Sequence, residues 1–115
     1  MSDCIFCMLA EKQIPTTVVY EDDLVFAFND AEPKAPVHIL IIPRKHFASL
    51  AEATAEDAAV LGHIQMVAAK LAVEHGIDKT GYRVLTNCGP DSGQGVFHLH
   101  YHLIGGENLG DICGG

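Results

Sequence analysis

Alternation of polar and apolar positions is strongest near the C-terminal end of the chain, over residues 96–104. Three histidines alternate there with apolar residues, at His98, His100 and His102. This alternation predicts a half-buried strand, whose side chains point to its two faces in turn. With a rise of about 3.3 Å per residue, the histidines would stand about 7 Å apart in a row on one face. The intervening Leu99, Tyr101 and Leu103 would face the core.

Four earlier segments also favour strands. Residues 17–20 and 24–28 are rich in β-branched and aromatic residues and flank an acidic turn, so they predict a hairpin. Residues 37–42 are apolar nearly throughout, which is typical of a central strand, and Pro43 would end it. Residues 81–87 predict the fourth strand, which leads through a glycine-rich loop into the histidine segment.

A helical repeat covers residues 54–75. Apolar residues recur every three or four positions at Val60, Ile64, Val67 and Leu71. Thr54 followed by Asp57 resembles a capping box, and Gly76 is suited to end the helix. A shorter helix is expected over residues 4–12, ended by Ile14-Pro15, with three side chains toward the core: Ile5, Phe6 and Leu9.

These elements predict an α+β fold, with an antiparallel sheet of five strands and the long helix packed on one face. At 115 residues the chain is long enough for one domain and too short for two. We therefore expect a single domain over residues 1–115, in which residues 107–115 form a short C-terminal tail.

Composition narrows the classes of partner. The formal net charge is −8 and no run of Lys or Arg occurs, which argues against nonspecific binding to nucleic acid. No apolar stretch is long enough to span a membrane, and the N-terminus lacks the pattern of a signal peptide. We therefore expect no membrane partner and a cytoplasmic protein, in which cysteines are thiols or metal ligands rather than disulfides.

Cys4 and Cys7 form a Cys-x-x-Cys pair, the spacing that lets two thiolates bind one metal ion. Two histidines would complete a tetrahedral site, and from spacing alone every histidine of the chain is a candidate: His38, His46, His63, His75 and the three of residues 98–102. A redox dithiol and a pair of buried small residues are the alternatives. We expect Cys113 to be a free thiol with no assigned role.

The loop of residues 87–95 directly precedes the three histidines. Its glycines let backbone N–H groups approach a ligand closely and form an anion site. A phosphate cradle beside imidazoles predicts attack on phosphorus, with histidine as nucleophile or acid. A strand face that is merely rich in histidine is the alternative. His38, inside an apolar strand, fits a core histidine satisfied by one hydrogen bond.

The motif of residues 98–104 resembles that of the histidine triad (HIT) family of nucleotide hydrolases and transferases. The resemblance extends from Cys4 to about Gly106 and is greatest to the small, purine nucleoside phosphoramidase-like branch. It is carried also by the segments 27–30, 35–46, 87–89 and 93–97.

The resemblance implies that His100 is a nucleophile that attacks the α-phosphate of a purine nucleoside phosphoramidate or related nucleotidyl ester. His102 would donate a proton to the leaving amine, and Asp30 would bind the ribose hydroxyls. His38 matches a supporting fourth histidine. The positions that match the purine side are Ile5, Phe6, Leu9, Phe28, Ala31 and Leu40. The positions that match the phosphate side are Asn87, Gly93, Gln94, Gly95 and Val96.

The resemblance also implies a structural Zn²⁺ ion held by Cys4, Cys7, His46 and His98, which would make His98 a metal ligand. It further implies a homodimer whose sheet continues across the two-fold axis. Two features depart from the branch: Gly95 stands where a serine is usual, and the chain has no tryptophan.

Three alternatives to this enzyme remain. The first is a nucleotide-binding regulatory or interaction protein with little turnover, and the second is a dinucleoside polyphosphate hydrolase. The third, zinc bound by the triad itself, is disfavoured because the outer histidines of a regular strand would lie about 14 Å apart.

Overall fold

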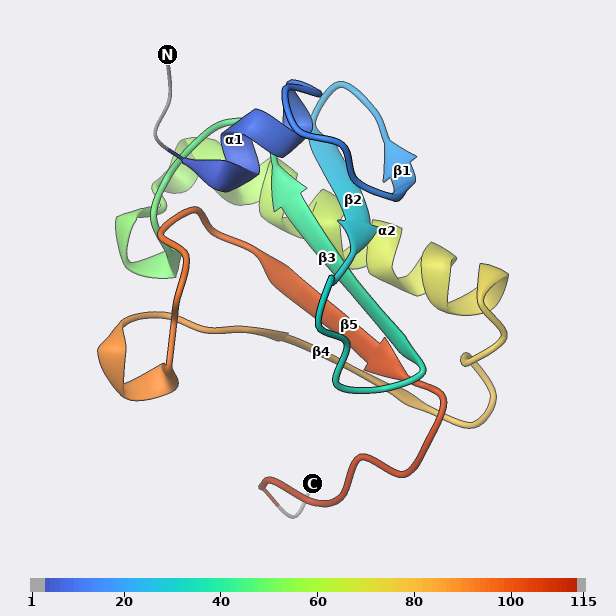
Figure 1. Ribbon diagram of the computed structural model, residues 1–115. Coiled ribbons are helices and arrows are strands. Elements are labelled where there is room, and N and C mark those ends of the chain that lie inside the picture. The colour runs from blue at the N-terminus through green and yellow to red at the C-terminus, as the bar shows by residue number, and fades with distance from the viewer. Residues whose placement is uncertain (1–3, 114–115) are drawn as a thin grey trace.

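The chain builds one antiparallel sheet between two helices of unequal length (Figure 1). The computed structural model describes residues 4–113. The helices are α1 (Ile5–Ala10) and α2 (Ala58–Glu74). The strands are β1 (Val18–Glu21), β2 (Val25–Asn29), β3 (Val37–Pro43), β4 (Tyr82–Thr86) and β5 (Tyr101–Gly105). Three short 3-10 helices lie at Leu50–Glu52, Ala55–Asp57 and Pro90–Ser92.

The sheet has the order β1-β2-β3-β5-β4, and every neighbouring pair is antiparallel. The predicted fold class, five antiparallel strands with one long and one short helix, is confirmed. β3 lies at the centre, where Leu40 is opposite His102 and Ile41 is opposite Tyr101. This register places the histidine strand beside the most buried strand of the sheet.

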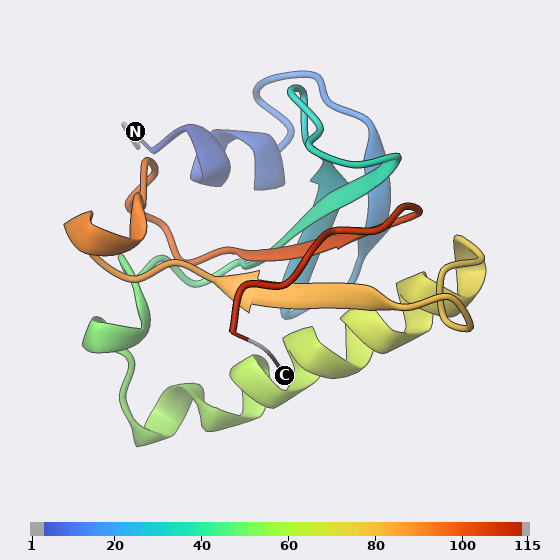
Figure 2. The same cartoon turned by 90° about the horizontal axis from the view of Figure 1, so that it is seen from below.

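The two helices cover opposite faces of the sheet, as Figure 2 shows. Strand residues therefore alternate between two cores, which explains why β2 and β3 are apolar nearly throughout. One core packs Val25, Ile39 and Leu103 against α2, and Leu99 and Tyr101 belong to the same core, as expected. The other core packs residues of β2 and β3 against α1: Phe26, Phe28, Leu40 and Ile42 contact Phe6, Leu9 and Ala10.

The predicted capping box caps the 3-10 helix Ala55–Asp57, which leads directly into α2 at Ala58. The Asp57 carboxylate accepts a hydrogen bond from the Thr54 backbone N–H at 2.8 Å and pairs with Lys45 Nζ at 2.8 Å. The Lys45 ammonium is the main cause that lowers the pKa of Asp57. Ile64, Val67 and Leu71 form the buried stripe of the helix, so the predicted helical face is confirmed.

Two predicted boundaries are wrong. The N-terminal helix ends at Ala10, because Lys12 adopts a φ of 62°, and Ile5 is 47% exposed rather than in the core. The histidine strand begins only at Tyr101, so of the triad only His102 lies in it. Residues 98–100 leave the ladder because the Leu99 N–H donates to Phe47 O at 2.8 Å.

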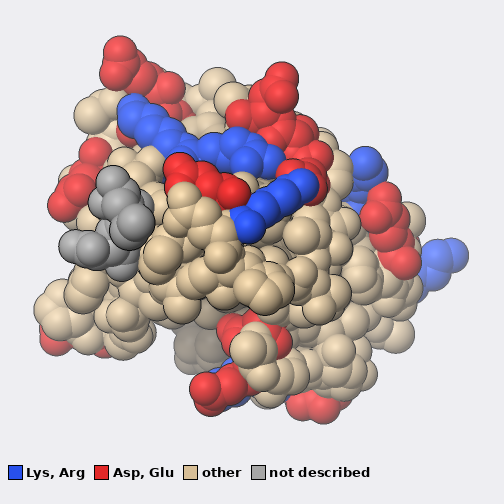
Figure 3. Space-filling view, turned by 45° about the horizontal axis from the view of Figure 1, so that its top comes forward, with Lys and Arg blue, Asp and Glu red and all other residues tan. Residues whose placement is uncertain are grey.

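Charged side chains of both signs are interleaved on the face drawn in Figure 3. Ion pairs of this kind join Lys12 and Arg44 to Glu21, each at 3.1 Å. Within residues 4–113, no helix has the length and hydropathy that crossing a membrane requires.

Candidate active site and metal centre

A cavity of about 460 Å³ opens on the face of the sheet that carries α1. His100 and His102 line it, together with every predicted substrate-binding residue except Gln94. Pro15, Thr16 and Asn29 also line the cavity and were not predicted, although they adjoin predicted elements. Two larger hollows, of about 590 and 710 Å³, lie along β4 and residues 106–113, and no histidine lines them.

His100 is held in one tautomer by the backbone. Its Nδ1 lies 2.8 Å from the carbonyl oxygen of His98, and a carbonyl can only accept a hydrogen bond. Nδ1 therefore carries the proton, and Nε2 has a free lone pair. The edge of the Phe6 ring packs on the imidazole, with ring centroids 4.9 Å apart, so the orientation of this nucleophilic nitrogen is fixed as well.

The tautomer of His102 is set by His38, which is buried. The Lys34 backbone N–H donates to His38 Nδ1 at 2.9 Å, so the proton of a neutral His38 is on Nε2. That Nε2–H faces His102 Nδ1 at 2.9 Å, with the Asp30 carboxylate at 3.4 Å. His102 Nδ1 therefore accepts, and the proton of His102 is on Nε2.

His102 Nε2 is the one buried side-chain nitrogen or oxygen without a hydrogen-bond partner among the described residues. Buried polar groups are normally paired, so this N–H is suited to a ligand acceptor in the cavity. Burial, reinforced by the neighbouring His100, lowers the pKa of His102 to about 4. The imidazole is therefore neutral at pH 7 and donates a hydrogen bond without carrying a charge, until a bound anion raises its pKa.

Asp30, His38 and His102 also form a group whose ligand atoms lie within 4.8 Å of one another. Metal binding at His38 Nε2 would require its proton to move to Nδ1, where it would meet the Lys34 N–H. Two donors cannot share that hydrogen bond. This group is therefore suited to orient a proton rather than to hold a metal.

The glycine-rich loop uses several of its N–H groups internally. The N–H groups of Gly89, Ser92, Gly93 and Gln94 are all bonded within the loop. Gly89 and Gly93 both have a φ of 85°, which favours glycine. Among the described residues, no acceptor is found for the N–H groups of Gly95 and Val96, which line the cavity. These two N–H groups are donors that can bind an anion in the cavity.

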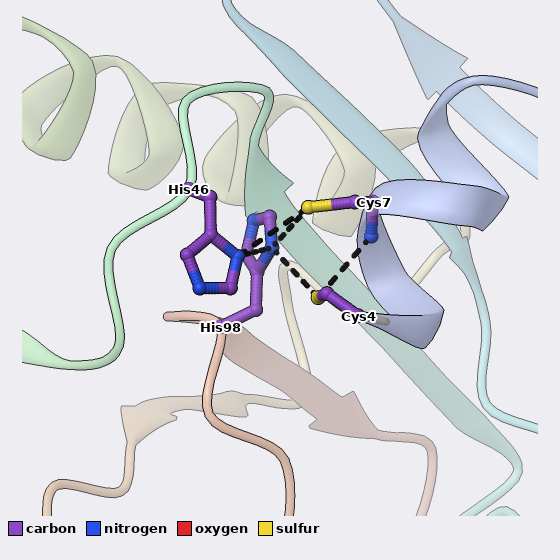
Figure 4. Close-up of side chains that lie close together, drawn as sticks. All are labelled: Cys4, Cys7, His46 and His98. Atoms are coloured by element: carbon purple, nitrogen blue, oxygen red, sulfur yellow. Dashed lines mark hydrogen bonds between the residues drawn. The ribbon is translucent and has the colours of Figure 1, made fainter. Parts of the chain in front are cut away.

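Four side chains from three distant segments converge in one cluster, as Figure 4 shows. Cys4 and Cys7 come from the start of α1, His46 from the loop after β3, and His98 from the segment before β5. His98 Nε2 donates to Pro43 O at 2.8 Å, which leaves the lone pair of Nδ1 directed at the cluster. His98 is fully buried, and burial lowers its pKa, so the imidazole is neutral as metal binding requires.

The distances in this cluster are close to those between the ligand atoms of a tetrahedral ion, and slightly shorter. His98 Nδ1 lies 3.1 Å from His46 Nδ1, 3.3 Å from Cys4 Sγ and 3.4 Å from Cys7 Sγ. Bonds of about 2.1 Å to nitrogen and about 2.3 Å to sulfur would separate tetrahedral ligand atoms by roughly 3.3–3.8 Å. Two thiolates and two imidazoles are also a ligand set typical of structural zinc.

Comparisons with known proteins identify the family. The HIT domain family model matches residues 11–109. The chain belongs to the HIT family. The resemblance that the sequence predicted is thereby confirmed.

Relatives and solved structures of the HIT family match nearly the whole chain. Purine nucleoside phosphoramidase of Escherichia coli K12 is 44% identical over 110 residues, which cover 96% of this chain and 92% of the relative. An uncharacterized HIT-like protein of Synechococcus elongatus is 50% identical over 107 residues, covering 93% of each chain. The structure of a histidine triad protein from Clostridium difficile has a TM-score of 0.94 at 50% identity, with 97% of each chain covered. A HIT family hydrolase from Clostridium thermocellum has a TM-score of 0.93 at 46% identity, again with 97% of each chain covered.

Proposed function

We propose that this HIT protein is a hydrolase that acts at the α-phosphate of purine nucleoside phosphoramidates or related nucleotidyl esters. The observation that carries the proposal is the pair of fixed tautomers in one cavity: a lone pair on His100 Nε2 and an unpaired N–H on His102 Nε2. A nucleophile and a donor of this kind are what displacement at phosphorus needs. The names of the Escherichia coli phosphoramidase and of the Clostridium thermocellum hydrolase support the same class.

The other end of the cavity suits a purine nucleoside. It is lined by apolar side chains from α1, β2 and β3: Ile5, Phe6, Leu9, Phe28 and Leu40. Asp30 lies between this apolar end and His38, and its carboxylate is partly exposed. We assign to it the acceptance of hydrogen bonds from the ribose hydroxyls, because an ionised carboxylate offers only acceptors.

In the first step, His100 Nε2 attacks the α-phosphorus, and the bond between phosphorus and the leaving amine breaks. The bound substrate anion raises the pKa of His102, and the resulting imidazolium gives its Nε2 proton to the leaving nitrogen as the amine departs. In the second step, water attacks the phosphorus and its proton returns to His102 Nε2, while the bond between phosphorus and His100 Nε2 breaks and the nucleoside monophosphate is released. The N–H groups of Gly95 and Val96 bind the phosphate oxygens during both steps.

We further propose that Cys4, Cys7, His46 and His98 hold one Zn²⁺ ion with a structural role. Four protein ligands leave no position for substrate, so the ion would link α1 to the triad segment. His98 would then serve both sites, since its ring binds the metal and its carbonyl oxygen fixes His100. Reduced thiolates fit the expectation of a cytoplasmic protein.

We also propose that the protein forms a homodimer. β4 is an edge strand of the sheet, and Tyr82 on it is 38% exposed. An edge strand presents backbone donors and acceptors that a second copy could pair. Continuation of the sheet across a two-fold axis is the arrangement that the family resemblance led us to expect.

The function is tested by steady-state assays of the purified protein with adenosine and guanosine phosphoramidates and with a dinucleoside polyphosphate. The proposal expects a kcat/KM at least tenfold higher for the phosphoramidates. Preference for the dinucleoside polyphosphate would move the protein to that class of hydrolase. Tight binding of nucleoside monophosphate without turnover of any substrate would instead favour a regulatory protein.

A further inference from the structure

Gln94 differs from the other loop residues that were expected to contact phosphate. Its side chain does not line the cavity, although Gly93, Gly95 and Val96 on either side of it do. The residue is only 8% exposed and therefore lies inside the protein. A buried primary amide needs partners for its donors and its acceptor.

Each partner of the Gln94 amide is a backbone group. Oε1 accepts from the N–H of Gly89 at 2.9 Å. Nε2 donates to the carbonyl oxygens of Ala48 at 2.7 Å and Val96 at 3.0 Å. Both amide hydrogens and one oxygen lone pair are thereby used, and no donor of this side chain is left for a ligand.

These three bonds hold both ends of the loop and tie it to a second segment. Gly89 is at the start of the loop, and Val96 is at its end. Between the two points of attachment lie the Gly95 and Val96 N–H groups, which have no acceptor among the described residues. Ala48 belongs to the segment that also carries His46, and this segment is bonded to the triad through Phe47 O and the Leu99 N–H at 2.8 Å.

We propose that Gln94 is a positioning residue: its buried amide clamps the loop so that the Gly95 and Val96 N–H groups face the phosphate before the substrate binds. This inference rests on the proposed function for the identity of the ligand. It changes the role of Gln94 from direct contact with substrate to organisation of the backbone donors. Preorganised donors bind a phosphate without the cost of ordering the loop at each encounter.

Two substitutions separate the roles. Gln94→Glu preserves the size of the side chain but replaces the donor to two carbonyl oxygens by a carboxylate, which would repel them. Gln94→Met preserves approximate size and removes all three bonds. Gln65→Glu is the matched control, because Gln65 is an exposed residue of α2 outside the cavity. Dissociation constants for AMP and for adenosine are measured, together with amide hydrogen exchange at Gly89 in the protein without nucleotide.

At pH 8 we expect Gln94→Glu to weaken AMP binding at least tenfold and adenosine binding less than twofold, because only AMP uses the loop. Exchange at Gly89 should accelerate at least tenfold in Gln94→Met, which offers this N–H no acceptor, and stay unchanged in Gln65→Glu. The carboxylate of Gln94→Glu can still accept from the Gly89 N–H, so this variant tests the two bonds that Nε2 donates. The ratio of AMP dissociation constants, Gln94→Glu to wild type, should fall as the pH is lowered to 5.5. Burial raises the pKa of the introduced carboxyl, and its protonated form regains one donor.

Unchanged exchange at Gly89 in Gln94→Met would overturn the clamp. Equal losses for AMP and adenosine would also overturn it, because they would show general damage to the cavity. A wild-type protein that bound neither AMP nor adenosine would refute the proposed function. Accelerated exchange at Gly89 in Gln94→Met would still support the clamp.

Discussion

Replacement of His38 by leucine tests the chain of hydrogen bonds that fixes His102. The substitution leaves two groups without a partner: the N–H of Lys34 and Nδ1 of His102, each now bonded at 2.9 Å. A buried polar group that loses its partner costs about 1–3 kcal/mol. Because Lys34 is an exposed residue whose N–H can reach water, we expect the free energy of unfolding to fall by about 2 kcal/mol, near the lower end of the sum.

The His38→Leu substitution should also lower kcat, because the tautomer of His102 is then no longer fixed. Without the His38 donor, nothing in the described structure keeps the proton of His102 on Nε2. The lost bias is that of one neutral hydrogen bond, about 1–1.5 kcal/mol, which corresponds to a decrease of about tenfold in kcat. Removal of the donor itself in His102→Ala should cost more, about 10²–10⁴-fold, as is typical of a general acid.

His38→Gln is the matched control, because a glutamine amide can place a donor near the position of His38 Nε2 and should recover part of the rate. The assays are steady-state kinetics and ¹⁵N NMR of the His102 imidazole, which reports which nitrogen carries the proton. A wild-type spectrum with the His102 proton on Nδ1, or wild-type turnover by His38→Leu, would refute the reasoning.

Three further predictions concern the metal, the pH and the assembly. Metal analysis of the protein purified without chelator should find about one zinc per chain. Cys4→Ser should lose the metal and melt at a much lower temperature, since structural zinc contributes on the order of 10 kcal/mol of apparent binding energy. Metal-free wild-type protein would contradict the site. Burial lowers the pKa of His102 to about 4, so the unfolded chain binds a proton at a higher pH than the folded protein does. The free energy of unfolding in urea should therefore fall by about 3 kcal/mol between about pH 6.5 and 4. A flat profile for wild type relative to His102→Ala would count against the burial of this imidazole. Light scattering at micromolar concentration should give twice the mass of one chain, and a monomeric mass would exclude the proposed dimer.

The sequence was most informative where one periodic pattern decides which face of an element is buried. The apolar run of residues 37–42 predicted a central strand because both its faces are covered, by α1 and by α2. The stripe of Ile64, Val67 and Leu71 predicted α2 for the same reason, since a helix must bury one side. Local rules of this kind fail at the ends of helices and strands, as at Lys12 and before Tyr101. There, contacts with distant segments decide the conformation.

The pattern of polar and apolar residues does not predict contacts between residues that are distant in the sequence. His38 and His102 are 64 positions apart, and no periodicity indicates that the Lys34 N–H fixes the proton of both. His63, a candidate metal ligand from spacing alone, pairs instead with the Asp22 carboxylate at 2.6 Å. Within the Cys4, Cys7, His46 and His98 cluster, spacing indicated only the cysteine pair, and the resemblance supplied the histidines. The burial of Gln94 could not be foreseen, because a polar residue between two glycines is typical of an exposed loop.

The central claim is that His100 attacks phosphorus through Nε2 and carries the nucleotide between the two steps. Wild-type protein is mixed with a labelled adenosine phosphoramidate, quenched within milliseconds into alkaline denaturant, digested and examined by mass spectrometry. The account predicts a peptide with adenylate attached to His100, and no such peptide from His100→Gly, which should still bind AMP. Adenylate on another residue, or turnover by His100→Gly near the wild-type rate, would contradict the account.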